Sequence, residues 1–233
     1  MPTTNYPSPE SSRTGADTVY LSEKTPDTTA ELVRERLRSM PVLPPELLEL
    51  ADVDRDLTEE EIIRIFNHIP LFVVADDEDI VRRALVRGLK SYTGKGGKEV
   101  RELTGTNATE SVSDLCRTKS NELPIITCKD GAQAEAVLRE IGLQGIPSGV
   151  IVMDDVMPEK AGLEVLRECN SEVPPGFSRI LQSGYVGSLK TGTEIDDATR
   201  EGSMDSFVPK PYRMISAHSV YAKSFLRRQR RGN

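Results

Sequence analysis

The chain lacks tryptophan altogether, is poor in aromatic residues and has no long apolar run. Aromatic residues make up 5% and the hydrophobic set 37% of its 233 residues, which is typical of a soluble protein with a lean core. No segment approaches the ~20 consecutive apolar residues of a membrane-spanning helix. The N-terminal MPTTNYPSPESS has neither the basic start nor the apolar stretch of a signal peptide, so we expect a cytoplasmic location.

Cysteine and histidine are also scarce, and acidic residues outnumber basic ones. The three cysteines form no C-x-x-C pair, which excludes both a disulfide framework and a zinc site of the usual spacing. The two histidines, His68 and His218, lie in no catalytic motif, and we expect no chemistry from either. The net charge of −7 argues against a protein that coats nucleic acid over its whole surface.

The first 70 residues contain too little apolar sequence for a core of their own. Residues 1–28, rich in Pro, Ser, Thr and Asp, predict a disordered arm. Residues 29–70 predict a helical extension of three short helices, the last of which has the capping box Thr58-x-x-Glu61 and ends at Pro70. We expect these helices to pack on the following domain or on a partner.

From Leu71 onwards, short apolar segments alternate with helical ones. Five segments predict buried strands, at 71–75, 124–128, 149–153, 178–182 and 205–208. The segments after each strand predict helices, at 79–90, 132–141, 162–169, 186–201 and 212–230. The alternation predicts an α/β fold: a doubly wound, five-stranded parallel sheet with helices on both faces. We expect one such domain over residues 71–228, followed by a basic tail at 229–233.

Polar residues follow four of these strands at the point where each strand ends. They are Asp76-Asp77, Asp154-Asp155, Ser183 and Lys210. In parallel α/β sheets, ligands bind beyond the carboxyl ends of the strands. Crowded carboxylates raise one another's pKa unless a cation is present, and several carboxylate oxygens suit Mg²⁺. A carboxylate beside Mg²⁺ and a lysine can act as a nucleophile toward a phosphoryl group.

The motifs around these residues resemble the receiver domain of two-component response regulators. VVADDEDIVRRAL resembles the first strand and acidic pair of that family, and CKDGAQA resembles its second strand–helix turn. VIVMDDVMPEKAGLEVL contains D-x-x-M-P-x-x-x-G, while ILQSGY and GSMDSFVPKPY contain the hydroxyl residue and the Lys-Pro. Each motif is weak alone, but all of them in order at strand ends are specific. The resemblance covers 71 to about 228 and implies the CheY-like strand order 2-1-3-4-5.

The resemblance implies a phosphoryl acceptor and a metal site. Asp154 would accept the phosphoryl group from a phosphohistidine, whereas Asp155 lies one place too late for the motif. Mg²⁺ would be held by Asp77, Asp154 and the backbone carbonyl of Val156, with Asp76 acting largely through water.

The resemblance also implies the residues that contact the phosphoryl group and relay its presence. Ser183 would donate to one phosphoryl oxygen and Lys210 would pair with another, and the Lys210–Pro211 bond would be cis. Phe207 would change rotamer together with Ser183, although a plain core role explains Phe207 equally well. Phosphorylation would then bias the surface at 186–228, through which the chain could form a homodimer.

Three features depart from the family or modify its chemistry. Residues 91–123 form an insertion after the first helix, with a predicted helix at 98–103 and a role as a surface or partner contact. Val156 and Tyr185 stand at the two positions that tune phosphoryl lifetime, and since neither is acidic we hypothesise slow self-hydrolysis. Six basic residues and no acid follow Tyr212; they could contact phosphates, or simply form a solvated helix end.

The sequence therefore predicts a receiver that takes a phosphoryl group from a histidine kinase or phosphotransfer protein onto Asp154. It would signal by contact with a downstream protein, without a DNA-binding domain and without enzymatic activity beyond its own phosphorylation and dephosphorylation. A first alternative is a pseudo-receiver scaffold that binds partners unphosphorylated. A second is a Mg²⁺-dependent phosphohydrolase, for which Asp155 is the candidate acid–base residue.

Overall fold

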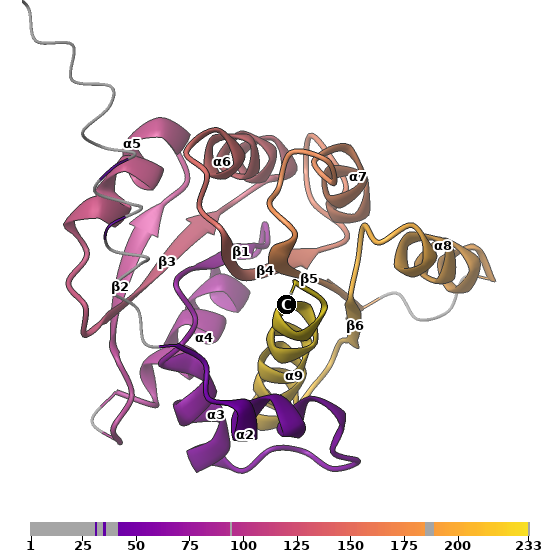
Figure 1. The fold of residues 1–233 in the computed structure, drawn as a ribbon. Coiled ribbons are helices and arrows are strands. Elements are labelled where there is room, and N and C mark those ends of the chain that lie inside the picture. The colour runs from indigo at the N-terminus through magenta and orange to yellow at the C-terminus, as the bar shows by residue number, and fades with distance from the viewer. Residues whose placement is uncertain (1–30, 32–34, 36–41, 94, 185–188, 233) are drawn as a thin grey trace, which may run out of the picture.

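The structure, a computed structural model, describes residues 31, 35 and 42–232 with the exception of 94 and 185–188 (Figure 1). The predicted arm at 1–28, nearly all of the first predicted helix at 29–40, and Tyr185 lie outside the described residues. Within the described part of the chain, no helix is long and apolar enough to cross a membrane.

Parallel strands form a six-stranded sheet in the order β2-β3-β1-β4-β5-β6. The strands are β1 (Phe72–Ala75), β2 (Glu99–Thr104), β3 (Glu122–Cys128), β4 (Ser148–Asp154), β5 (Gly176–Ser183) and β6 (Ser206–Pro209). The five predicted strands are β1, β3, β4, β5 and β6, and they lie in the predicted relative order. The predicted count of five is wrong, because β2 adds a sixth strand at the edge beside β3.

Helices cover both faces of this sheet (Figure 1). The helices α4 (Asp79–Lys90) and α9 (Met214–Gly232) contribute to the core on one face. The helices α6 (Gly131–Leu143), α7 (Gly162–Glu168) and α8 (Leu189–Arg200) contribute to the core on the other. The fold is therefore the doubly wound α/β arrangement that the sequence predicts.

The central strands divide their side chains between these two cores. Val73 and Ile151 pack in the core of α6 and α7, whereas Phe72 and Val150 pack in the core of α4 and α9. Because successive side chains of a strand point to opposite faces, a strand covered on both sides has to be apolar throughout. This explains the short unbroken apolar runs of the sequence.

The segment 91–123 is part of the sheet, and the helix predicted at 98–103 is wrong. Val100 and Leu103, three residues apart, fit one face of a helix, yet they lie in β2 and pack against opposite cores. Pairing of β2 with β3 along its whole length outweighs this local pattern. The segment continues into α5 (Ala108–Ser113), which packs on α6, and the 3-10 helix η2 (Asp114–Arg117).

The segment 43–69, here called the N-terminal layer, packs across α9. It comprises α2 (Pro45–Leu48), the 3-10 helix η1 (Glu49–Asp52) and α3 (Glu59–Phe66), whose predicted capping box is present. Leu47, Ala51, Leu57, Ile62, Ile63, Ile65, Phe66 and Ile69 are buried in the same core as α4 and α9. Of the two expectations for these helices, packing on the following domain is what the structure shows.

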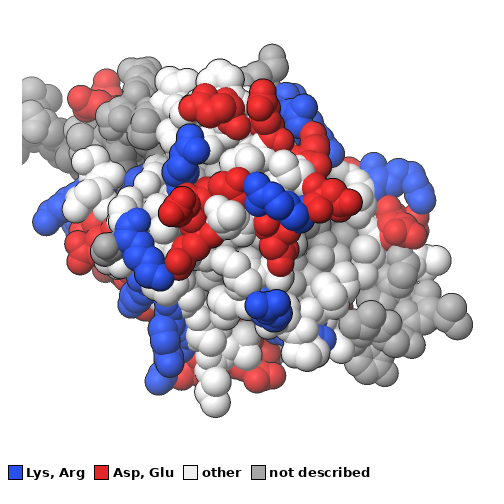
Figure 2. Space-filling view, turned by 90° about the horizontal axis from the view of Figure 1, so that it is seen from below, with Lys and Arg blue, Asp and Glu red and all other residues white. Residues whose placement is uncertain are grey.

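Polar contacts also join the N-terminal layer to α9. The Leu57 amide donates to Ser219 Oγ at 2.8 Å, and Lys223 Nζ donates to the carbonyl of Val53 at 2.9 Å. Arg227 and Arg230 both pair with Asp52. Figure 2 views the molecule from below, the side on which α2 and α3 lie in Figure 1, and shows basic and acidic side chains interspersed there.

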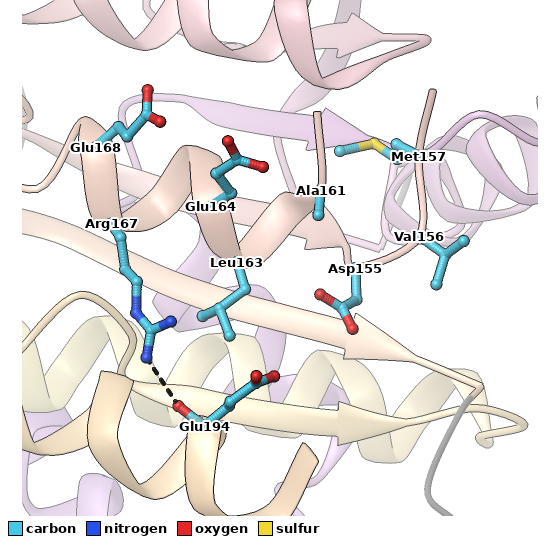
Figure 3. Close-up of a pocket in the computed structure, with 9 residues that line it drawn as sticks. All are labelled: Asp155, Val156, Met157, Ala161, Leu163, Glu164, Arg167, Glu168 and Glu194. Atoms are coloured by element: carbon cyan, nitrogen blue, oxygen red, sulfur yellow. Dashed lines mark hydrogen bonds between the residues drawn. The ribbon is translucent and has the colours of Figure 1, made fainter. Parts of the chain in front are cut away.

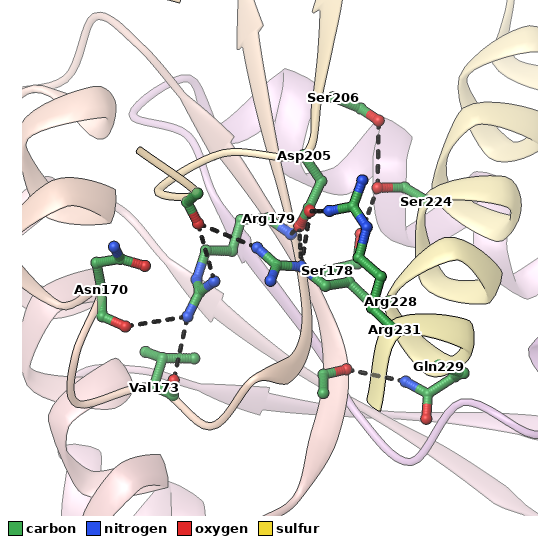
Figure 4. A network of polar contacts seen from close by, with 12 residues as sticks. Asn170, Val173, Ser178, Arg179, Asp205, Ser206, Ser224, Arg228, Gln229 and Arg231 are labelled. Atoms are coloured by element: carbon green, nitrogen blue, oxygen red, sulfur yellow. Dashed lines mark hydrogen bonds and ion pairs between the residues drawn. The ribbon is translucent and has the colours of Figure 1, made fainter. Parts of the chain in front are cut away.

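Asp205, a partly buried residue whose side chain is 7% exposed, joins the far end of α9 to the sheet (Figure 4). Its carboxylate accepts from Arg228 Nε and from the Arg179 amide, and Arg231 lies 3.6 Å away. The Arg179 guanidinium donates to the carbonyls of Asn170, Val173 and Gly202. Four of the six basic residues after Tyr212 thus have acidic partners within the chain, an arrangement that neither alternative for these residues predicted.

Candidate functional site

Three carboxylates meet at the carboxyl edge of the two central strands. Asp76 and Asp77 follow β1, and Asp154 ends the neighbouring strand β4. One oxygen from each carboxylate lies within 4.8 Å of the others. Asp76 is 1% exposed and Asp154 8%, while Asp77 is exposed. The pairing of β1 with β4 thus brings together Asp76 and Asp154, which lie 78 positions apart in the chain.

Lys210 joins two of these carboxylates. Its Nζ atom lies 2.8 Å from Asp76 Oδ2 and 2.7 Å from Asp154 Oδ1. The Lys210 amide donates to the carbonyl of Ser183 at 2.8 Å, which holds the end of β6 against the end of β5. The predicted cis peptide bond between Lys210 and Pro211 is confirmed.

Burial and charge act in opposite directions on the ionisation of this cluster. Burial raises the pKa of Asp154, and the nearby Asp76 and Asp77 raise it further, whereas the hydrogen bond from Lys210 lowers it. Burial opposes the charge on Lys210, but its hydrogen bonds to Asp154 and Asp76 outweigh burial, so the pKa of Lys210 is raised. The cluster therefore holds more negative charge than one ammonium group neutralises.

The loop after Asp154 is fastened to its surroundings through the backbone. The Asp155 amide donates to the carbonyl of Gln182 at 2.8 Å, and the Gly162 amide donates to the carbonyl of Asp155 at 2.9 Å. A Cβ atom at Gly162 would lie 2.0 Å from the carbonyl oxygen of Asp154. This close approach leaves no room for a Cβ atom at position 162 unless the backbone shifts.

The remaining predicted site residues lie around this centre. Ser183 is 1% exposed at the end of β5, where it pairs in register with Pro209. Val156 is 68% exposed in the loop after β4. Phe207 is half-buried in β6 and packs against the core of α6 and α7. Asp155 is not part of the cluster formed by Asp76, Asp77 and Asp154.

One basic residue near the site was missed by the sequence reasoning. Arg82, in the first turn of α4, donates to the backbone carbonyl of Asp76 at 2.5 Å and to Asp79 Oδ1 at 3.2 Å. The amide of Glu78 donates to Asp76 Oδ1 at 2.9 Å. Arg82 lies in the first turn of the helix predicted at 79–90, six residues after Asp76. Its position shortly after the acidic pair was the signal available in the sequence.

The donor set fits Mg²⁺. Carboxylate and carbonyl oxygens are the ligands this ion prefers, and it commonly binds through one or two carboxylates while keeping several waters. Burial is the main cause of the raised pKa of Asp154, and the charges of the crowded Asp76 and Asp77 add to it. A divalent cation held among Asp76, Asp77 and Asp154 would relieve this crowding.

Comparison with known proteins gives structural matches only. No protein-family model matches the chain, and no curated protein matches its sequence. A receiver domain protein from Clostridium thermocellum aligns with a TM-score of 0.44 and 15% identity, over 68% of this chain and 96% of its own. The response regulator domain of Thermotoga maritima CheB aligns at 0.39 and 20%, over 70% and 95%.

A third match is the receiver domain of the histidine kinase CKI1 from Arabidopsis thaliana in complex with Mg²⁺. It aligns at a TM-score of 0.35 with 23% identity, over 60% of this chain and 81% of its own. All three structures are receiver or response regulator domains. At these identities and TM-scores, no residue role is transferred from those proteins to this chain.

Proposed function

We propose that this chain is a phosphoacceptor receiver, which takes a phosphoryl group onto Asp154 and signals by protein contact. The observation that carries the proposal is the bridge of Lys210 between Asp76 and Asp154, beside Asp77. A nucleophilic carboxylate, a fixed ammonium group and crowded metal-type oxygens are the parts that phosphoryl transfer to aspartate needs. The donor would be a phosphohistidine of a histidine kinase or phosphotransfer protein.

In the transfer step, an oxygen of Asp154 attacks the phosphorus atom of the phosphohistidine. The new oxygen–phosphorus bond forms as the nitrogen–phosphorus bond breaks, and the electron pair of the broken bond stays on the imidazole, which takes up a proton from solvent. Asp154 has to be ionised to attack, and Lys210 favours this because its hydrogen bond lowers the pKa that burial raises. Lys210 and Ser183 would then each contact a phosphoryl oxygen.

Asp76, Asp77, Asp154 and the backbone carbonyl of Val156 would hold Mg²⁺. When bound, the ion would neutralise charge on the phosphoryl oxygens. Self-hydrolysis would be slow because Val156 carries no group that could orient a water. The domain at 71–228, with the N-terminal layer packed on it, would act as one signalling unit without catalytic turnover of an outside substrate.

The test is stoichiometric phosphorylation with Mg²⁺ and acetyl phosphate as a small-molecule donor, followed by intact-mass analysis. We expect one phosphoryl group per chain, none on Asp154→Asn, and unchanged labelling of the adjacent control Asp155→Asn. No labelling of the wild-type chain together with unimpaired partner binding would support the scaffold alternative. Release of many equivalents of phosphate per chain would support the phosphohydrolase alternative.

A further inference from the structure

A groove of about 620 Å³ lies between α7 and α8, beside the loop that follows Asp154 (Figure 3). Its lining is apolar along the middle, where Met157, Ala161 and Leu163 contribute side chains. Val156, a large apolar residue that is 68% exposed, lies at the end formed by the loop. Exposed apolar surface of this kind next to a functional loop is typical of interaction sites.

The polar lining of the groove is mainly acidic. Asp155 and Glu194 reach into it from the loop and from α8, and Glu164 lines it from α7 (Figure 3). Arg167 closes one end, but its guanidinium is already directed to the carbonyl of Glu194 at 3.3 Å and to Glu201 at 3.4 Å. The groove thus keeps an excess of negative charge over an apolar lining.

Two of these carboxylates, on Asp155 and Glu194, reach into the groove from its two sides (Figure 3). A cationic group placed between them would offset their negative charge, and its alkyl chain would cover the apolar lining. An arginine or lysine side chain next to a leucine-like side chain has both properties.

The opposite side of the molecule is already covered. The N-terminal layer packs along α9, and Ala217, His218, Tyr221, Ala222 and Phe225 are all buried. A partner could reach that side of α9 only by displacing the apolar contacts of this layer. Within the part of the chain that the structure describes, the groove between α7 and α8 remains open at the surface.

We propose that the groove between α7 and α8 docks a basic, apolar segment of a partner protein. Arginine or lysine side chains of the segment lie between Asp155, Glu164 and Glu194, and its apolar side chains contact Val156 and Leu163. The groove binds this segment in the unphosphorylated protein. A second effect rests on the proposed function: phosphorylation of the adjacent Asp154 adds negative charge and strengthens the same contact.

The probe is a fluorescein-labelled amphipathic peptide with arginine and leucine on one face, titrated with the full chain and followed by anisotropy. A second peptide carries glutamate at every arginine position. We expect saturable binding of the arginine peptide, and binding of the glutamate peptide at least tenfold weaker. Glu194→Gln should weaken the arginine peptide about threefold to fivefold, the upper range for an exposed ion pair.

Matched control variants test whether binding depends on the groove or on charged and apolar side chains elsewhere on the surface. Asp196→Asn removes the same charge from the same helix at an exposed position that does not line the groove, and should leave the affinity unchanged. Val156→Ser should weaken binding severalfold, whereas Leu143→Ser, at a residue 82% exposed that does not line the groove, should not. Equal affinities of the two peptides, or equal effects of Glu194→Gln and Asp196→Asn, would overturn the proposal.

The titration without a phosphoryl donor tests the groove alone. Repeated with Mg²⁺ and acetyl phosphate, it should give about twofold to threefold tighter binding, and Asp154→Asn should abolish this gain. Unchanged basal binding with no gain contradicts the coupling and leaves the groove intact as a site. If neither peptide binds in the absence of the phosphoryl donor, the proposal that the groove is a docking site is refuted, whatever the result with the donor.

Discussion

Phe66 lies in the N-terminal layer, outside the residues that resemble a receiver, yet its replacement by alanine should strongly destabilise the whole domain. Its side chain is 4% exposed. The ring makes edge-to-face contacts with Phe72 of β1, Tyr92 and His218 of α9, at centroid distances of 5.3, 5.5 and 5.9 Å. These partners belong to the strand, the insertion and the last helix, so Phe66 joins three separate parts of the chain.

The expected decrease in the free energy of unfolding follows from the burial of the Phe66 ring. Truncation of a buried phenylalanine to alanine costs about 3–5 kcal/mol, through lost transfer free energy and the cavity left behind. Edge-to-face pairs add about 0.5–1.5 kcal/mol beyond area burial, which places Phe66→Ala in the upper part of that range. For a domain of this size, each kcal/mol lowers the melting temperature by about 2–4 °C, so a decrease on the order of 10–15 °C is expected.

The measurement is the free energy of unfolding of the full chain from urea titration, with circular dichroism and tyrosine fluorescence as independent probes. Leu143→Ala, at a residue 82% exposed, is the control, and a change below about 0.5 kcal/mol is expected for it. If Phe66→Ala lowers stability by less than about 1 kcal/mol, or if the two probes separate, the N-terminal layer is a loosely attached module and the reasoning is refuted.

Three further predictions concern the acceptor site and the core. Lys210→Met leaves the carboxylates around Asp154 without their ammonium partner; by calorimetry we expect about tenfold tighter Mg²⁺ binding, together with a large loss of phosphorylation. Gly162→Ala places a Cβ atom against the Asp154 carbonyl, so both stability, by about 1–3 kcal/mol, and the rate of phosphorylation should fall. Burial lowers the pKa of His218 to about 4 from 6.5, so the unfolded chain binds the proton first as the pH falls. Stability should therefore decrease by roughly 1.5 kcal/mol between pH 6.5 and 5, and the loss should be smaller in His218→Phe.

His218 shows that a single histidine outside any motif gives little information about its place in the structure. No chemistry was expected from it, and the structure places it in the core. It is 1% exposed, its Nδ1 atom lies 2.7 Å from the Tyr92 hydroxyl, and its ring packs among Phe66, Tyr92 and Tyr221. Tyr92 lies in the insertion, and nothing in the local sequence pairs it with a residue 126 positions away.

The strand β2 shows the opposite case, in which local sequence pointed to the wrong structure. Val100 and Leu103 have the spacing of a helix face, and the charged residues between them obscure the alternation of a strand. The deciding interaction is the parallel ladder with β3, which begins at Glu99 and Glu122. Such pairing joins segments that are distant in sequence, so a window of a few residues cannot reveal it.

The sequence by itself determined the alternation of strands and helices and the placement of acidic, hydroxyl and lysine residues at strand ends, while the strand order was implied by the resemblance of its motifs to receiver domains. These follow from short apolar runs, helical patterns and motifs, all of which are local in the chain. Only the tertiary structure decided that Lys210 contacts both Asp76 and Asp154, that β2 extends the sheet, and that the N-terminal layer closes one side of α9. These outcomes depend on which surfaces meet once the chain is compact, and the gain from burying them together exceeds the local preferences that the sequence displays.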